Sequence, residues 1–240
     1  MRRGRLDATG QRAPHRGAAA WSQDRGRQFH WQGKLAADQL VAIKNVNSDI
    51  DASTGDVDQV EVTAEKSGRN ADQIHIEVVP GHEGLPFAPS VPDLRQTAAP
   101  HFKLWQWAWD NGKVHFTIRL PNTLRFAADN VNGNVHAADV GRAVRANSVN
   151  GNVNVSTAAW AEAGTVNGAI KAWMAGAGWE GTLKIESVNG SIELDLPGDL
   201  NAQVKFSSLK GRIDSDSPLT VSNGWPVAHS ASATLGKRRS

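Results

Sequence analysis

Six short segments of the chain repeat one pattern, and this repeat restricts the possible folds more than any other feature of the sequence. Apolar residues stand seven and five positions before a glycine and two positions after it, and a small polar residue stands three positions before it. Two degenerate copies, Val46-Asn47-Ser48 and Leu209-Lys210-Gly211, lie at either end. The four complete copies are Val131-Asn132-Gly133, Val149-Asn150-Gly151, Val166-Asn167-Gly168 and Val188-Asn189-Gly190.

Each copy is typical of a strand, a sharp bend and a second strand. Apolar residues spaced by two indicate half-buried strands, and an Asn-Gly pair supplies the positive φ angles that a bend requires. The last five glycines are separated by 18, 17, 22 and 21 residues, which is too short for a βαβ unit of about 30 residues. The spacing instead predicts coils stacked about 4.8 Å apart. The expected fold is all-β, a single-domain parallel β-solenoid or β-helix.

A second interpretation treats each Asn-Gly pair as a two-residue hairpin turn in an antiparallel meander or barrel. Stacking is favoured because equivalent residues that recur at a nearly constant period belong above one another. Asparagines at the bends could then form hydrogen-bonded ladders. The predicted bend residues are Asn132, Gly133, Asn150, Gly151, Asn167, Gly168, Asn189, Gly190 and Gly211.

The stretch between the first two copies lacks the repeat. Residues 80–100 hold five of the ten prolines and are expected to form a surface loop. Residues 102–120 contain Asn111-Gly112 and predict a β-hairpin insertion, in which Trp107 faces Phe116 and Trp105 faces Ile118. We expect these tryptophans to be the buried side of the hairpin, with a carbohydrate-stacking platform as the alternative. Trp173 and Trp179 are expected in the glycine-rich loop between repeats and are better candidates for exposed contacts.

Charge divides the chain into three parts. Residues 1–27 carry seven arginines against two aspartates and are expected to be a disordered basic tail, and residues 237–240 form a short basic C-terminal tail. The predicted solenoid domain, residues 28–236, has a net charge of −6. Because an acidic surface repels phosphates, we expect no nucleic acid to bind the core. A contact between the tails and an anionic surface remains an alternative.

Motifs for catalysis or cofactor binding are absent or stand in the wrong context. The chain has no cysteine and no apolar run of about 18 residues that would cross a membrane. Residues 176–181 match a dinucleotide-binding fingerprint, but a strand is expected to follow where that motif needs a helix. The histidines show no metal-ligand spacing. We therefore expect no enzyme activity, no cofactor and no metal.

Acidic residues are the remaining catalytic candidates. The densest cluster comprises Asp49, Asp51, Asp56 and Asp58. Two further pairs, Glu193 with Asp195 and Asp214 with Asp216, take outward positions on their strands. Outward acids are more simply explained as solvation of an exposed face, although paired carboxylates could serve polysaccharide cleavage.

The Val-Asn-Gly-x-Ile units, the Leu120-Pro121 step and the opening segments 31–35 and 41–47 resemble a bacterial family known as "putative adhesins", of unknown function. The resemblance covers about residues 29–215. It implies a β-solenoid that is usually exported, with no assigned catalytic residues. Ser48 departs from the pattern, because it replaces a glycine where a positive φ is expected. The basic N-terminal segment also lacks the apolar stretch of an export signal.

These features together predict a non-catalytic structural or interaction module, adhesin-like and belonging to the bacterial cell envelope. The resemblance implies an extracytoplasmic location, periplasmic, on the cell surface or secreted. The expected partner is a cell-surface protein or a polysaccharide. Two alternatives stay open at this point. One is a carbohydrate-active enzyme or glycan-binding module on a β-helix scaffold, and the other is a regulatory domain that binds anionic surfaces through its tails.

Overall fold

The computed structural model describes residues 21–69, 71–81, 101–107, 112–176, 182–197, 202–210, 213–215, 220–224 and 228–235. Within these residues the protein is all-β, and the helical content is the three-residue 3₁₀ helix η1 (Ala71–Gln73). The predicted loop beyond Gly81, the bend residue Gly211 and the C-terminal tail lie outside the described residues.

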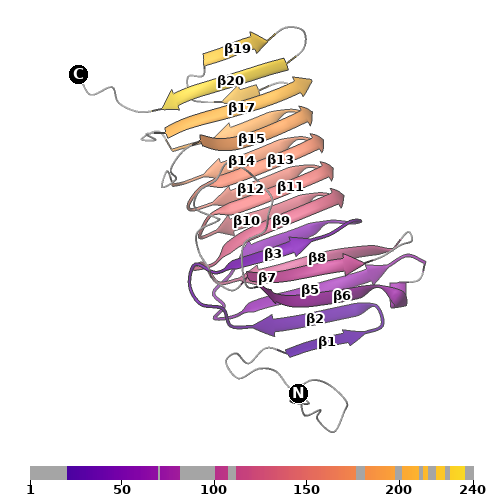
Figure 1. Cartoon of the computed structure of the whole chain (residues 1–240). Helices are drawn as coiled ribbons and strands as arrows, with labels where there is room; N and C mark the ends of the chain where they lie inside the picture. The colour runs from indigo at the N-terminus through magenta and orange to yellow at the C-terminus, as the bar shows by residue number, and fades with distance from the viewer. Residues whose placement is uncertain are drawn as a thin grey trace, which may run out of the picture.

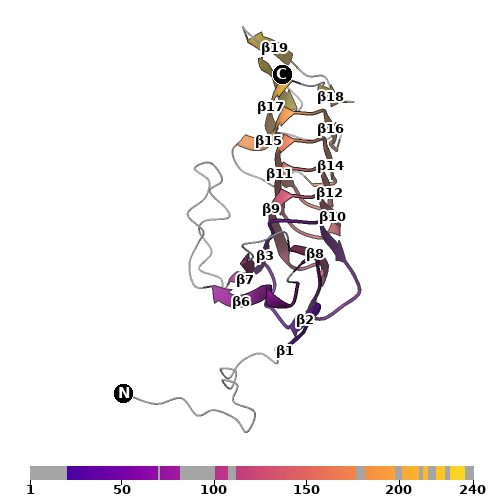
Figure 2. The ribbon, with the colours of Figure 1, turned by 90° about the vertical axis from the view of Figure 1, so that its right-hand side faces the viewer.

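The strands form two ten-stranded sheets, which face each other as two columns (Figures 1 and 2). In spatial order the first sheet contains β1 (Trp21–Arg25), β2 (Gln28–Gly33), β5 (Val60–Ser67), β8 (Lys113–Leu120), β4 (Ile50–Thr54), β10 (Val135–Val140), β12 (Val153–Thr157), β14 (Ile170–Met174), β16 (Ile192–Asp195) and β18 (Ile213–Ser215). The second sheet contains β19 (Thr220–Gly224), β20 (Ala228–Leu235), β17 (Ala202–Lys210), β15 (Thr182–Asn189), β13 (Ala161–Asn167), β11 (Val144–Asn150), β9 (Arg125–Asn132), β3 (Leu40–Lys44), β7 (His101–Trp107) and β6 (His75–Gly81).

Each repeat places one strand in each sheet, and we call this pair of strands a layer. Successive layers pair in parallel in both sheets, from β9 and β10 to β17 and β18. Equivalent positions lie opposite one another, so that Val144 pairs with Phe126 on one side and with Ala161 on the other. The parallel pairing excludes the antiparallel meander for these repeats.

The first repeat joins the same array although it is distant in sequence. Strand β3 pairs in parallel with β9, and β4 pairs in parallel with β10. Val41 lies opposite Phe126, and Ile50 lies opposite Val135. The chain between the first and second repeats contributes two strands to the other side of the β3–β4 layer. There β7 pairs with β3 and β8 pairs with β4, both in parallel. The repeats therefore form six consecutive layers with β7 and β8 beneath them (Figure 1).

Antiparallel strands continue both sheets beyond the layers. In the first sheet β8, β5, β2 and β1 pair antiparallel in that order, and in the second sheet β6 pairs antiparallel with β7. At the other end of the second sheet, β20 pairs antiparallel with β17, and β19 pairs antiparallel with β20. Strand β1 begins at Trp21 and pairs with β2. The predicted tail boundary at residue 27 was therefore wrong, and residues 1–20 lie outside the described residues.

The predicted hairpin over residues 102–120 was also wrong, because β7 and β8 belong to different sheets. Phe102 lies opposite Val41 and Phe116 lies opposite Ile50, so this segment forms a further layer. Fourteen residues separate Phe102 from Phe116, against nine between Val41 and Ile50. The longer connection, which contains the Asn-Gly pair, leads from one sheet to the other. A separate hairpin would have left its strand edges unpaired, whereas here each strand has a neighbour on both sides.

The core lies between the two sheets and is built from the alternating apolar residues of the repeat. In the second sheet, one buried row runs through Val41, Phe126, Val144, Ala161 and Leu183. The residues that alternate with them point outward, so the outer faces of the two sheets carry polar side chains. Among the described residues, a binding site is therefore to be sought on an outer sheet face, at the bends or at the ends of the array.

Candidate functional site

Asparagines at the bends form a ladder along the edge of the layers. The Nδ2 atom of each asparagine donates to the Oδ1 atom of the asparagine in the preceding layer, over 2.8–3.0 Å. The first rung continues to the carbonyl of Gly112, 3.2 Å from Asn47 Nδ2. The hydrogen-bonded ladder expected from stacking is thus confirmed. Its members are Asn47, Asn132, Asn150, Asn167 and Asn189.

The bend glycines are needed chiefly for close approach between layers. A Cβ atom built on Gly151 would lie 2.0 Å from the carbonyl oxygen of Gly133, and one on Gly168 would lie 2.1 Å from that of Gly151. The prediction of positive φ was wrong for Gly151, Gly168 and Gly190, none of which adopts it, and correct for Gly133, with φ of 147°. Glycine is required at these bends because neighbouring layers approach too closely to leave room for a side chain.

The small polar residue three positions before the glycine has a buried structural role. Ser148 donates from its hydroxyl to the carbonyl of Gly133 at 2.8 Å, and Thr165 donates in the same way to the carbonyl of Gly151 at 2.9 Å. Ser187 repeats the contact with Gly168 at 3.1 Å. Because these side chains are at most 5% exposed, each hydrogen bond satisfies polar atoms that water does not reach.

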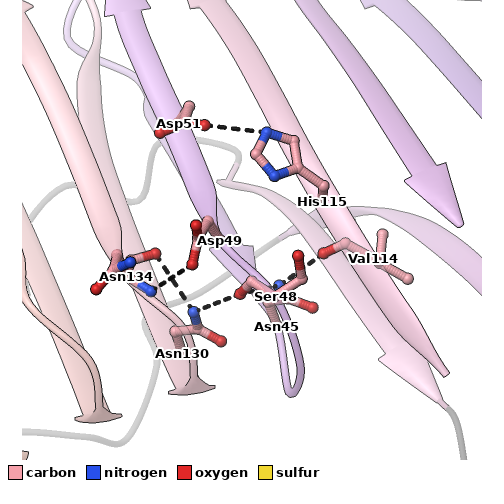
Figure 3. A network of polar contacts seen from close by, with 8 residues as sticks. All are labelled: Asn45, Ser48, Asp49, Asp51, Val114, His115, Asn130 and Asn134. Carbon is pink, nitrogen blue, oxygen red and sulfur yellow. Dashed lines mark hydrogen bonds and ion pairs between the residues drawn. The ribbon is translucent and has the colours of Figure 1, made fainter. Parts of the chain in front are cut away.

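The first bend combines a positive φ at Ser48 with a network of hydrogen bonds, and Figure 3 shows this network. Ser48 has φ of 96°, as expected for a residue that replaces a glycine with positive φ. Its carbonyl accepts from Asn45 Nδ2 at 3.0 Å and from Asn130 Nδ2 at 2.8 Å. Asn45 also donates to the carbonyl of Val114 at 2.8 Å. These contacts connect three layers at one point.

The acidic cluster of the sequence is not assembled into one site. Asp49 accepts from the backbone N–H of Asn134 at 2.7 Å, and Asp51 lies 3.0 Å from His115 Nε2 (Figure 3). Asp58 pairs with Lys34 at 2.5 Å, and this hydrogen bond and charge lower the pKa of the Asp58 carboxyl. Each of these three carboxylates thus has its own partner, and each partner belongs to the surrounding sheet or loop.

Glu162, in β13, is the one described carboxyl group whose pKa is clearly raised, to about 6. Burial is the main cause, since the residue is 8% exposed although it lies between the inward-facing Ala161 and Ala163. The charges of Arg145 and Lys184 lower the pKa and offset part of this effect. The sequence did not single out Glu162, because its strand position predicts exposure.

An open groove of about 590 Å³ lies on the outer face of the first sheet. It crosses β10, β12, β14 and β16, and its polar lining on these strands comes from their outward positions. Residues from successive layers lie opposite one another there, so the groove is built by the repeat itself. The lining includes His136, Asn154, Lys171, Trp173, Glu193 and Asp195.

Trp173 is the largest apolar surface in this groove. Its side chain is 45% exposed, more than any other large apolar side chain among those described. Ser156 and Asp195 flank it on the neighbouring strands. The expectation that Trp173 is exposed is confirmed, although it lies in β14 and not in a loop. The predicted pairing of Trp105 with Ile118 and of Trp107 with Phe116 was wrong, because β7 and β8 belong to different sheets. Trp179 and the side chains of Trp105 and Trp107 lie outside what the structure describes, so their burial or exposure stays a prediction.

A second row of polar residues runs beside Trp173. His136, Asn154, Lys171 and Glu193 lie opposite one another on consecutive strands. Lys171 Nζ is 2.7 Å from Glu193 Oε2, which makes an exposed ion pair. The predicted outward phase of Glu193 and Asp195 is confirmed, since both are exposed and both line the groove. Sequence reasoning considered the outward acids beside the tryptophan-containing segment as an enzyme alternative, but it did not identify His136, Asn154 or Lys171 as part of the same surface.

No metal centre or membrane span is visible in the part of the chain that the structure describes. Among those residues, no three His, Cys, Asp or Glu side chains are grouped so that they could hold an ion. None of the described helices has the length and apolarity that crossing a membrane requires. Strand β15 follows the glycine-rich segment 176–181, as expected from the sequence, so a helix N-terminus for a pyrophosphate does not follow the motif.

Comparisons with known proteins give little further information. No protein-family model matches the chain, and no curated protein matches it. A solved structure from Clostridium sporogenes, titled a putative cell adhesion protein, is similar over 90% of this chain and 91% of its own, with 12% identity and a TM-score of 0.43. At these values we base no argument on the likeness.

Proposed function

We propose that this protein is a non-catalytic interaction module, adhesin-like, of the bacterial cell envelope. The observation that supports it best is the groove on the outer face of the first sheet, where four layers present exposed polar side chains around Trp173. A concave surface that combines aromatic or apolar side chains with a few convergent polar groups is a usual form of a recognition site. The resemblance of residues 29–215 to an adhesin family agrees with this function.

The scaffold for this function is, in our proposal, a parallel β-solenoid. In its support, each bend carries the chain from the second sheet to the first, and the next layer begins again in the second sheet. Equivalent residues pair in register, and the asparagine ladder and the backbone bonds from bend glycines to the next layer join the bends. A solenoid of this kind presents an extended, rigid surface, which suits adhesion to a large partner.

Binding suits the groove better than catalysis for an electrostatic reason. Catalytic acids and bases are typically groups whose pKa is strongly shifted. Among the described residues, the carboxyl group with a lowered pKa, Asp58, and the one with a raised pKa, Glu162, do not line the groove. Within it, Lys171 and Glu193 neutralise each other's charge. The groove thus offers hydrogen-bonding groups and one aromatic surface.

The test is binding to isolated envelope fractions and to intact bacteria, measured by co-sedimentation of the purified full chain. We expect the double variant Lys171→Ala/Glu193→Ala to lose most of the binding. The matched control, Lys184→Ala/Glu186→Ala, removes one charge of each sign from the second sheet and should bind like the wild type. Absence of binding by the wild type, or equal losses in both variants, would contradict the proposal. Cell fractionation tests the location, and an exclusively cytoplasmic protein would contradict it.

A carbohydrate-active enzyme is the second candidate, and one observation favours it. Glu193 and Asp195 stand two positions apart on β16, beside the exposed indole of Trp173. Two positions along a strand span about 7 Å, and inverting glycosidases hold their carboxyl groups about 6.5–9.5 Å apart. Release of reducing ends from polysaccharides by the wild type, lost in both Glu193→Gln and Asp195→Asn, would establish this activity over simple binding.

A further inference from the structure

We infer that the groove binds an uncharged polysaccharide, one sugar ring of which stacks on the indole of Trp173. This inference rests on the proposed function, because it names the class of ligand for the same groove. Four features of the groove support it, namely the exposed aromatic side chain, the polar groups beside it, their charge, and the length of the surface that they form.

The position of Trp173 is unusual for an apolar side chain of this size. Its strand neighbours Ala172 and Met174 point into the core, while Trp173 takes the outward position and is 45% exposed. Serine and carboxylate side chains lie opposite it, so no apolar neighbour on the adjacent strands covers its ring. A flat indole surrounded by polar groups matches the amphipathic ring of a pyranose, which has an apolar C–H face and a hydroxylated rim.

The side chains around the indole suit the hydroxyl groups of a sugar. Asn152, Asn154 and Ser156 line the groove on β12 and directly before it, and amide and hydroxyl groups can both donate and accept. Part of this capacity is used within the protein, because Asn152 Oδ1 accepts from the backbone N–H of Ala169 and the Ser156 hydroxyl bonds to Asp139. His136 adds a ring nitrogen at the next layer. Uncharged groups of this type can pair with hydroxyls in either direction, as a polyhydroxylated ligand requires.

The charges in the groove exclude an anionic polymer as the preferred ligand. Glu193 and Asp195 contribute two carboxylates, and Lys171 contributes one ammonium group that Glu193 already pairs. The predicted folded part of the chain, residues 28–236, also carries a net charge of −6. Uronate chains, phosphate polymers and nucleic acids would therefore meet repulsion at this surface.

The dimensions of the groove favour a chain over a single sugar. The lining extends over β10, β12, β14 and β16, and three strand spacings amount to about 14 Å. The groove is open and runs across the strands, so an extended polysaccharide can enter and leave at its ends. We therefore expect the affinity to rise with the number of sugar units until the four strands are covered.

Isothermal titration calorimetry of the full chain tests this inference. The probes are cellohexaose, chitohexaose and mannohexaose as uncharged chains, with polygalacturonate as the anionic comparator. We expect at least one uncharged chain to bind and Trp173→Ala to weaken it by about tenfold, as loss of one aromatic stacking contact implies. Trp173→Phe should retain most of the affinity. Val166→Ala, which shortens an exposed apolar residue at the bends, is the control and should bind unchanged.

Several outcomes would overturn the inference while leaving the proposed function in place. Polygalacturonate could bind more tightly than every uncharged chain, or Trp173→Ala could bind like the wild type. All the probes could also fail while the protein still binds envelope fractions through Lys171 and Glu193, which would point to another partner such as a protein. Circular dichroism of each variant verifies that its fold is intact. Failure of envelope binding itself would reject both the proposed function and the inference.

Discussion

In the repeated layers, from β3 and β4 to β15 and β16, neighbouring strands are parallel and equivalent residues lie in register. Beyond β8, by contrast, the first sheet continues through the antiparallel strands β5, β2 and β1. The antiparallel strands therefore continue the sheet that holds β4, β10, β12, β14 and β16 of the layers. The layers are joined by bends that contact each other through backbone atoms and asparagine side chains. The N-terminal end has no such ladder among its described residues and depends on side-chain packing.

The repeated layers and the N-terminal end also differ in the size of their buried side chains. The second-sheet strands of the repeats bury alanines in one row, including Ala128, Ala146 and Ala163. The N-terminal end buries larger residues, among them Phe29, Trp31 and Phe116. The comparison teaches that the layers are restricted most at their bends, where backbone meets backbone, and that the N-terminal end is restricted most in its core.

The largest effect is expected from a side chain at a bend. In Gly151→Ala the new Cβ would lie 2.0 Å from the carbonyl oxygen of Gly133, a backbone atom that cannot move without separating two layers. We expect a loss of at least about 4 kcal/mol in the free energy of unfolding, measured by urea denaturation. Gly55→Ala is the control, because its Cβ would meet the flexible Arg119 side chain at 3.1 Å. Equal effects would show that the bends are not the restricted sites.

The N-terminal end should respond most to loss of a large core residue. Phe116 is fully buried between β4 and β5, and Phe116→Ala should lower the free energy of unfolding by about 3–5 kcal/mol. Val153→Ala, at a fully buried position in the layers, removes less apolar volume and should cost about 2 kcal/mol. Thermal and urea unfolding measure both. A larger loss for Val153→Ala would reverse the comparison.

Within the layers, the buried hydrogen bonds should matter more than the exposed ladder. Ser148→Ala removes a buried donor to the Gly133 carbonyl and should cost about 1–3 kcal/mol. Asn150→Ala breaks two ladder bonds, but water replaces them because the ladder is exposed, and we expect about 0.5 kcal/mol. Urea denaturation compares the two variants. A greater cost for Asn150→Ala would show that the ladder is the main link between layers.

Glu162 makes the stability of the layers depend on pH. Its pKa in the folded protein is raised to about 6 from an ordinary 4.5, so the folded state holds the proton more tightly than the unfolded state. This stabilisation is complete below pH 4.5 and is lost as pH rises to about 6, a decline of at most about 2 kcal/mol. Glu162→Gln should lack this decline and be the more stable protein at pH 7.5. Parallel pH profiles for wild type and variant would reject the assignment.

The smallest effect is expected at the first bend, where the layers meet the N-terminal end. Ser48 has φ of 96°, which strains a residue with a Cβ atom. Ser48→Gly should raise the free energy of unfolding by about 0.5 kcal/mol, because relief of strain exceeds the entropy that glycine adds to the unfolded chain. Thermal unfolding measures the change. A loss of stability would show that the bonds to the Ser48 carbonyl already relieve the strain.

Local pattern predicted the layers well and the N-terminal end poorly. The spacing of apolar residues identified each strand pair of the repeat, and the serine at the first bend identified the position with positive φ. The Asn111-Gly112 pair predicted a hairpin because its nearest neighbours in sequence suited one. The actual partners of Phe102 and Phe116 are Val41 and Ile50, which lie far away in the chain. No local signal reports such pairing.

The candidate groove was predictable in its parts and not as a whole. Trp173 was recognised as a candidate for exposed contacts, and Glu193 and Asp195 were assigned to the outward face of a strand. Their association with His136 and Asn154 depends on which strands are neighbours and in what register. Glu162 escaped notice because the alternation of its strand predicts exposure, while the folded protein buries it.

By itself the sequence determined that the chain forms short strands with one buried face, joined by bends at the Asn-Gly pairs, because these properties follow from the spacing of apolar residues and glycines. The tertiary structure decided the order of the layers, the insertion of β4 between β8 and β10 and of β3 between β7 and β9, and the antiparallel end. It also decided which polar residues share the groove. The physical reason is that backbone pairing is nearly independent of side-chain identity, so the neighbours of a strand are selected by burial of the whole core.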